Sequence, residues 1–107
     1  MVLAFASKPL RDMCEIEEHA RRHLSSKVAD NLKHRLADLE AAASVEDLIV
    51  GSPRKSKASD TYLVDLADGF CLVFGANHIK NPVHGDGKVD WSKVSRVQVL
   101  SIGKCND

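Results

Sequence analysis

Basic side chains that could hold a nucleic acid lie in the second half of the chain. Arg54, Lys55 and Lys57 lie in a polar segment, residues 51–60, that contains few side chains able to pack in a core. Three cations in such a segment can bind phosphates of a nucleic acid backbone, and the alternative is an ordinary solvated loop. Because the net charge is zero and acidic residues concentrate in the first half, the two signs can segregate and leave one basic face.

Further candidate groups follow toward the C-terminus. Arg96 alternates with Val97 in a strand-like run, so the two side chains are expected to point to opposite faces. If the valine meets the core, Arg96 faces the opposite, functional side. Lys104 could neutralise charge on a phosphate, Asn106 is a candidate beside it, and the terminal carboxylate at Asp107 could accept a proton. The alternative for these residues is a frayed terminus.

The three cysteines, Cys14, Cys71 and Cys105, are expected to be free thiols. Their number is odd, their spacing is wide and no Cys-x-x-Cys pair occurs, which argues against a disulfide framework and against a zinc knuckle. Cys71 is expected to pack as a small hydrophobic side chain. His78 and His84 have no Cys or carboxylate at ligand spacing, so neither a metal nor a cofactor is predicted.

Length and composition indicate one domain, residues 1–107, of ordinary globular character. No apolar run approaches the roughly 20 residues that cross a bilayer, so no membrane partner is expected. The first seven residues lack the basic start and apolar length of a secretory signal. A cytoplasmic location is therefore predicted.

Three strand-like runs, Thr61–Leu66, Phe70–Phe74 and Val94–Ile102, predict a small sheet. Asp68-Gly69 between the first two runs is a strong hairpin signal, since Gly takes positive φ without steric cost. A longer connection, Gly75–Trp91, is expected to be a binding loop or a mobile one, with Trp91 anchored in the core.

The part of the chain before the sheet reads as mainly helical. A first helix is predicted from about Pro9 to His23, after a short apolar edge strand at Met1–Ala6. A second helix has an apolar stripe at Val28, Leu32, Leu36 and Leu39. A short helical turn is expected after Ser44. The predicted fold class is α+β: a helical hairpin on one face of a small twisted antiparallel sheet, with the other face free for function.

Two runs then add a family resemblance: Gly-aromatic-x-Leu-Val-Phe at Gly69–Phe74, and Val-Asp-Trp-Ser-Lys-Val at Val89–Val94. With the preceding helices, basic loop and strand in this order, the chain resembles the RelE/ParE toxin superfamily, most closely its HigB-like, proteic killer branch, over nearly its whole length. The resemblance implies a RelE-like fold. It also implies a toxin of a type II toxin–antitoxin system that inhibits translation by cutting mRNA on the ribosome. The implied partners are the ribosome, mRNA and a helix-turn-helix antitoxin.

By the same resemblance the enzyme is a metal-independent endoribonuclease whose nucleophile is the 2′-hydroxyl of the RNA. The protein would supply an acid, a base and cations around the scissile phosphate. The residues placed in that catalytic role are Arg54, Lys57, Arg96, Lys104 and Asn106. RNA binding is assigned to Arg54, Lys55, Lys57 and Arg96.

The sequence departs from the family pattern at two places. Cys71 stands where the family commonly has Arg, and Lys104-Cys105-Asn106 stands where the family commonly has Asp-Tyr-His. These departures leave an alternative: a toxin-fold protein with impaired catalysis that acts by binding only, to an antitoxin or to DNA gyrase. An unrelated small α+β adaptor is a third reading.

Overall fold

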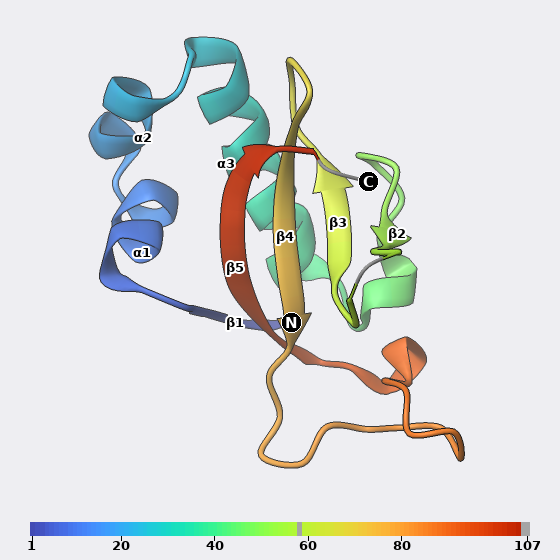
Figure 1. Ribbon diagram of the computed structural model, residues 1–107. Helices are drawn as coiled ribbons and strands as arrows, with labels where there is room; N and C mark the ends of the chain where they lie inside the picture. Colours follow the sequence, from blue (N-terminus) through green and yellow to red (C-terminus); the bar gives the residue numbers. More distant parts are fainter. Residues whose placement is uncertain (58, 106–107) are drawn as a thin grey trace.

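A computed structural model describes residues 1–57 and 59–105, and its framework is one five-stranded sheet (Figure 1). The strands are β1 (Val2–Phe5), β2 (Arg54–Lys55), β3 (Tyr62–Asp65), β4 (Phe70–Ala76) and β5 (Arg96–Lys104), in the spatial order β1-β5-β4-β3-β2. The predicted α+β class and the N-terminal edge strand are confirmed. The sheet is mixed rather than wholly antiparallel, because β1 runs parallel to β5 while the other pairs are antiparallel.

The β3–β4 hairpin turns as its sequence predicts. Asp68 has φ 57° and Gly69 has φ 76°. Two successive positive φ values at the centre of a turn are typical of type I′, whose twist matches that of the flanking strands. The backbone N–H of Phe70 donates to the carbonyl of Ala67 and closes the turn at 3.0 Å.

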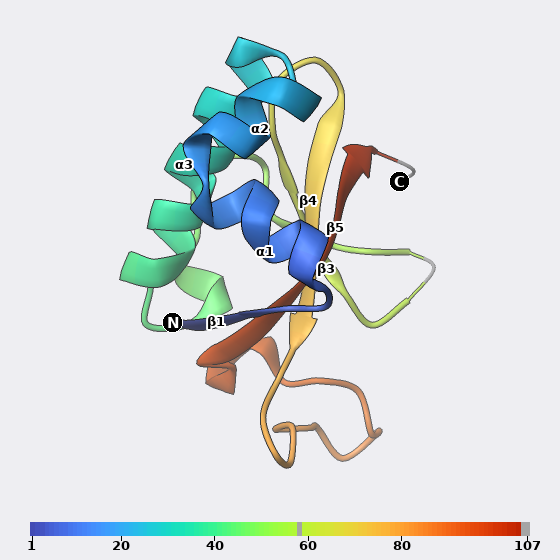
Figure 2. The same cartoon turned by 90° about the vertical axis from the view of Figure 1, so that its left-hand side faces the viewer.

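Helices cover one face of the sheet, as Figure 2 shows in side view. They are α1 (Lys8–Glu15), α2 (Glu17–His23) and α3 (Ser26–Ala41). The predicted single helix from Pro9 to His23 is wrong in one respect: it breaks at Ile16, whose backbone is extended at φ −110° and ψ 103°. The apolar spacing of the sequence continues across Ile16, so it gave no sign of the break.

Helix α3 forms for reasons that are visible in its sequence. The hydroxyl of Ser25 accepts the backbone N–H of Val28 and caps the first turn. The predicted stripe of Val28, Leu32, Leu36 and Leu39 is buried against the sheet. Burial of such a stripe supplies most of the stability of a helix in a small domain.

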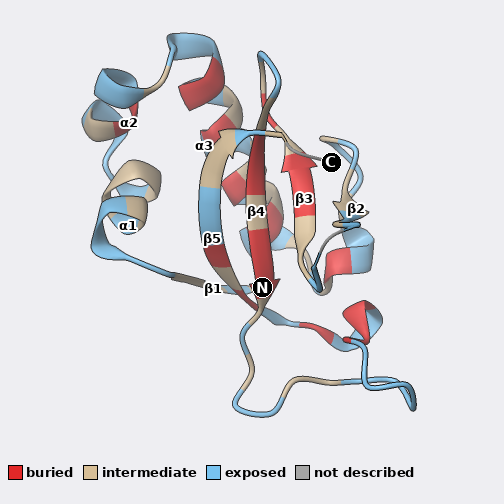
Figure 3. Ribbon diagram, viewed as in Figure 1, coloured by how far each residue is buried: buried red, intermediate tan, exposed pale blue. Residues whose placement is uncertain are grey.

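Buried residues are concentrated in β3, β4, α3 and the first half of β5 (Figure 3). Phe74 and Val97 are completely buried, and Trp91 is 2% exposed. The Trp91 ring lies 5.0 Å from the Tyr62 ring and 6.5 Å from the Phe74 ring, between centroids. The prediction that Trp91 anchors the long loop in the core is therefore confirmed.

Two short 3₁₀ helices complete the described chain: η1 (Val45–Asp47) and η2 (Trp91–Lys93). Ser44 and Asp47 form a capping box at η1, so the predicted helical turn after Ser44 is present. The loop between β4 and β5 extends beyond the end of the sheet (Figure 1). No helix in the described ranges has the length and apolar character that crossing a membrane requires.

Candidate functional site

The face of the sheet opposite the helices is hollowed into a cleft of about 590 Å³, here called the outer-face cleft. Side chains alternate along a strand, so residues next to the core-facing ones point into this cleft. In Figure 2 the segment after β2 and the end of β5 both project on this side of the sheet. The lining residues are Ser56, Ser59, Thr61, Leu63, Cys71, Val73, Ser101, Gly103, Lys104 and Cys105.

Cys71 and Cys105 form a disulfide in this cleft, with their Cα atoms 5.1 Å apart. The expectation of three free thiols is therefore wrong for this pair, while Cys14 is free. The sequence pattern did not indicate this pairing because the two cysteines are 34 residues apart in the chain. They meet because β4 and β5 are antiparallel and Cys71 lies opposite Gly103 in the register. Cys71 is buried, as predicted, but it faces the cleft rather than the helical layer.

Two charged residues flank the disulfide. Arg54 Nη1 lies 3.0 Å from Asp65 Oδ1, and Arg54 Nη2 lies 3.7 Å from Cys71 Sγ. The same Asp65 oxygen lies 3.4 Å from Cys71 Sγ and 3.8 Å from Cys105 Sγ. Ligand atoms of Asp65, Cys71 and Cys105 fall within 4.8 Å of one another, a spacing that could hold a metal. With the sulfurs joined, however, they offer no thiolate ligand.

The local structure around Arg54 differs from the predicted one. The polar segment 51–60 was predicted to be a loop, but Arg54–Lys55 forms β2, which pairs with Leu63 and Tyr62 of β3. Two-residue strands carry almost no sequence signal, because period-two alternation needs several residues to be seen. The pairing fixes the Arg54 guanidinium beside Asp65 instead of leaving it in a solvated loop.

Lys104 also lines the outer-face cleft, but its ammonium is engaged locally. Its Nζ donates to the Asp68 carbonyl at 3.1 Å and lies 4.7 Å from the centroid of the Phe70 ring. This contact anchors the end of β5 to the hairpin turn. Asn106 and Asp107, which the sequence placed beside Lys104, lie outside the described residues.

A second cleft of about 640 Å³ lies on the other side of the segment after β2, and we call it the lysine-lined cleft. Its cations are Lys55, Lys57 and Lys88, and it also contains His84. Its full lining is Lys55, Ser56, Lys57, Ser59, Asp60, His84, Asp86, Gly87, Lys88, Val89 and Trp91. Sequence reasoning did not single out Lys88 or Asp60, although the length of the loop around Lys88 predicted either a binding loop or a mobile one.

Hydrogen bonds of two acidic residues hold the lysine-lined cleft together. Asp60 Oδ2 accepts the backbone N–H of Val89 at 3.1 Å, which joins the two walls. Asp90 accepts the hydroxyl and the backbone N–H of Ser92. The Ser92 hydrogen bond, with the nearby charges of His84 and Lys93, lowers the pKa of Asp90 below its ordinary value.

Arg96 is not brought to either cleft. It begins β5 while Lys104 ends it, so at about 3.3 Å per residue the two lie roughly 25 Å apart. His78 lies near Arg96: its Nε2 accepts the backbone N–H groups of Ser95, at 3.1 Å, and Arg96, at 3.3 Å. The imidazole of His78 therefore holds the loop against the start of β5.

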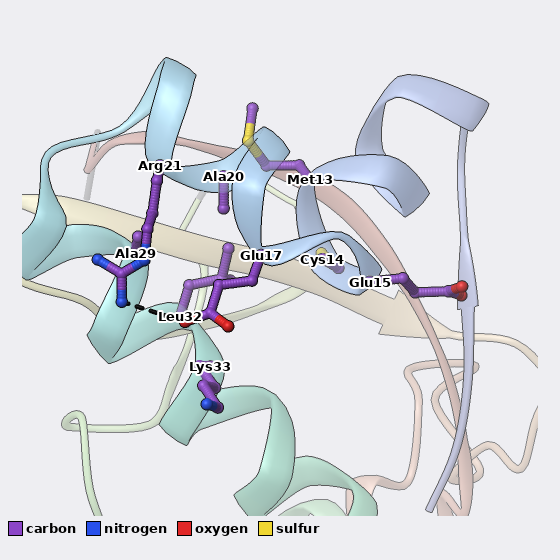
Figure 4. A pocket seen from close by; sticks show the side chains of 9 residues that line it. All are labelled: Met13, Cys14, Glu15, Glu17, Ala20, Arg21, Ala29, Leu32 and Lys33. Carbon is purple, nitrogen blue, oxygen red and sulfur yellow. Dashed lines mark hydrogen bonds and ion pairs between the residues drawn. The ribbon is translucent and has the colours of Figure 1, made fainter.

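A smaller cavity of about 230 Å³ lies among the helices (Figure 4). Arg21 lies at its edge and pairs with Glu17 and Asp30. Cys14 lines it, and burial, with the charge of Glu15, raises the pKa of this thiol to about 12. A thiol with so high a pKa is a poor nucleophile near neutral pH.

Comparisons with known proteins support the fold at low sequence similarity. No family model matches the sequence, and no curated protein is similar to it. Among solved structures, the chain is similar to the YoeB-YefM complex from Staphylococcus aureus, with a TM-score of 0.58 and 11% identity, over 98% of this chain and 97% of that chain. This match confirms the predicted RelE-like α+β fold.

Proposed function

We propose that this protein is the toxin of a type II toxin–antitoxin system and acts in the cytoplasm as a ribosome-dependent mRNA endonuclease of the HigB-like kind. The observation that carries the proposal is a pair of adjoining clefts that share Ser56 and Ser59, one on the uncovered face of the RelE-like sheet and the other between residues 55–60 and 84–91. Lys55, Lys57, Lys88 and Lys104 line these clefts. Cations around a groove attract and hold a phosphodiester backbone.

In the proposed complex the RNA backbone enters the lysine-lined cleft and crosses the segment after β2 into the outer-face cleft. Lys55 and Lys57 bind phosphates, and Lys57 and Lys104 stabilise charge on the scissile phosphate. Arg54 supports this site from beside Asp65, and Asn106 supplies a further polar contact. Arg96, at the far end of β5, contacts the backbone away from the cleavage position.

The nucleophile in this proposal is the 2′-hydroxyl of the RNA, which needs a base to accept its proton and an acid to protonate the leaving oxygen. Of the described residues in the two clefts, His84, Asp60 and Asp86 have side chains suited to proton transfer. All three line the lysine-lined cleft. We therefore place proton transfer there, at the boundary with Lys57.

One observation favours a second candidate function, binding without cleavage. Among the described residues that line the outer-face cleft, Lys104 is the one charged side chain, and none is a histidine. A cleft of this composition can hold a partner but has no obvious base of its own. On this reading the protein binds an antitoxin, or DNA gyrase, through the same face.

Induced expression in bacteria separates these functions. Growth arrest with new 5′ ends inside translated mRNAs is the expected result, and co-expression of a helix-turn-helix protein encoded beside the gene should restore growth. Arrest with DNA-damage signalling instead would favour gyrase, and no arrest would overturn the nuclease proposal. A His84→Ala, Lys57→Ala variant is expected to lose the mRNA cuts, while Lys27→Ala, on the helical face, retains them.

A further inference from the structure

We propose that the Cys71–Cys105 disulfide is a reversible thiol-exchange site, opened by small thiols from the Cys105 side. This role goes beyond the proposed nuclease function and does not depend on it. Three features of the described residues carry it: the unequal exposure of the two sulfurs, the charges beside them and the position of the bond in the outer-face cleft.

The two cysteines differ in accessibility. Cys71 is 1% exposed and lies within the sheet, between β3 and β5. Cys105 is half-buried and follows the last strand, where it lines the outer-face cleft. Thiol exchange requires the attacking sulfur to approach along the axis of the bond being broken, so access decides which sulfur is attacked. A thiol that enters the cleft therefore reaches Cys105 Sγ.

The charges favour the same direction of attack. When Cys105 is attacked, the electron pair of the broken bond goes to Cys71 Sγ, which has the Arg54 guanidinium 3.7 Å away and the Asp65 carboxylate 3.4 Å away. When Cys71 is attacked, the pair goes to Cys105 Sγ, which lies 3.8 Å from the same carboxylate. A leaving thiolate departs faster when its charge is stabilised. Arg54 also neutralises Asp65, at 3.0 Å, which reduces the repulsion between that carboxylate and the Cys71 thiolate.

The chemistry is ordinary thiol–disulfide exchange with a small thiol, RSH. The thiolate RS⁻ forms a bond to Cys105 Sγ, and the Cys71–Cys105 bond breaks with its electron pair on Cys71. A second RS⁻ then attacks the external sulfur of the mixed disulfide, releases RSSR and leaves Cys105 as a thiolate. After both thiolates are protonated, the disulfide and two RSH have become the dithiol and RSSR, and RSSR drives the reverse reaction.

Opening the bond would change the cleft itself. The disulfide ties the residue after β5 to the start of β4, and the remaining backbone tie is the bond from the Cys105 N–H to the Gly69 carbonyl, at 2.9 Å. Reduction leaves Cys105 held by that hydrogen bond, next to Lys104, which stays paired with Phe70 in the sheet. The redox state of the pair thus sets whether Cys105, which lines the outer-face cleft, is covalently fixed.

The test uses the full chain in a Cys14→Ser background, so that only the pair reacts. Oxidised protein is equilibrated with mixtures of reduced and oxidised glutathione, and free thiols are counted by mass spectrometry after alkylation. The expected result is reversible opening of the folded protein. Early quenching by alkylation should trap glutathione on Cys105 at least about tenfold more often than on Cys71. Equal amounts of glutathione on the two cysteines would overturn the proposal, as would a bond that glutathione opens only on unfolding.

The role of Arg54 has its own control. Arg54→Gln is expected to slow opening of the disulfide about tenfold. Arg22→Gln makes the same change on the exposed surface of α2 and should leave the rate unchanged. Circular dichroism checks that each variant is folded before the rates are compared. An Arg54→Gln rate equal to that of Arg22→Gln would show that the guanidinium does not assist the leaving sulfur.

Discussion

Arg54 forms an ion pair with Asp65, with 3.0 Å between Nη1 and Oδ1, across the paired strands β2 and β3. The pair cancels one of the three positive charges that the sequence places in residues 54–57. Lys55 is exposed and has no ion-pair partner among the described residues. The positive charge of Arg54 is therefore balanced by a carboxylate, whereas that of Lys55 is not. RNA-binding measurements on variants of the two residues can detect this difference.

Replacing Lys55 and Lys57 by Ala is expected to weaken binding to single-stranded RNA and to reduce its salt dependence. Each lost phosphate contact on a single strand should reduce the slope of log K against log salt by about 0.7, so the double variant should lose about 1.4. Fluorescence titration at several salt concentrations measures this slope. The matched control is Lys27→Ala with Lys33→Ala on α3, and an equal loss in both double variants would remove the lysine-lined cleft from RNA binding.

Asp65→Asn should have the opposite effect on RNA affinity. It frees the Arg54 guanidinium from its counter-charge, so we expect binding to tighten by a few-fold at low salt. Arg54→Ala should weaken binding less than Lys55→Ala does, because its charge is already balanced. The same titration tests both variants. Weaker binding by Asp65→Asn would mean that the ion pair positions the site.

Truncation of Trp91 to Ala is expected to lower the free energy of unfolding by about 3–5 kcal/mol. The side chain fills the space between Tyr62 and Phe74 and attaches the long loop to the core. Urea denaturation measures the loss, and Trp91→Phe, which keeps an aromatic ring there, should lose less. A loss below about 1 kcal/mol would contradict a core role for this side chain.

Gly51→Ala should be markedly more harmful than Gly85→Ala. Gly51 has φ +90°, and a Cβ there would lie 2.6 Å from Val64 Cγ1 and 3.0 Å from the Asp65 carbonyl oxygen. The backbone strain and the clash together should lower the free energy of unfolding by about 2–4 kcal/mol. At Gly85 nothing lies within 4 Å of the added atom, so a change within about 0.5 kcal/mol is expected. Thermal or urea denaturation that ranks the two equally would refute this account of Gly51.

Ser92→Ala should raise the pKa of Asp90 toward its ordinary value, because the hydrogen bond from the Ser92 hydroxyl is the largest cause of its lowering. A carboxyl with a lower pKa in the folded than in the unfolded protein stabilises the fold above the unfolded pKa. That contribution is lost as pH falls through the folded pKa. Ser92→Ala is thus expected to be less stable at neutral pH and to converge with the parent protein in acid.

Titration of Asp90 by nuclear magnetic resonance, with urea denaturation at neutral and acid pH, tests this expectation. Ser95→Ala is the matched control, since its side chain is exposed and Ser95 makes its hydrogen bonds through its backbone, to His78 and Val2. An Asp90 midpoint that is the same in Ser92→Ala and Ser95→Ala would show that the Ser92 hydroxyl is not the cause.

Local patterns in the sequence predicted the local parts of the fold. The Asp68-Gly69 turn, the apolar stripe of α3 and the helical turn after Ser44 depend on residues a few positions apart, and all three are present. The break at Ile16 and the two-residue strand β2 were missed. Neither changes the apolar spacing over a window long enough to detect it.

The candidate site was harder to predict because its residues lie on different strands and become neighbours only through the pairing register of the sheet. Sequence reasoning placed Lys55, Lys57 and Lys104 near one functional face, and the structure puts them on adjoining clefts. Sequence reasoning could not show that Arg96 lies at the far end of β5 from Lys104. It also could not show that Cys71 and Cys105 are neighbours. The disulfide joins the two positions where the sequence departs from the family pattern, a link that becomes visible only once β4 and β5 are paired.

Val2 of β1 pairs with Arg96 of β5, so the edge strand β1 cannot form its sheet hydrogen bonds until β5 has been synthesised, near the end of translation. Until that partner has emerged, β1 has no neighbour to complete its hydrogen bonds, and α1 and α2 have only part of the sheet to cover. Such long-range closure slows the acquisition of structure during synthesis. Newly made chains would therefore pass through an interval in which the basic segment exists but the groove around it does not.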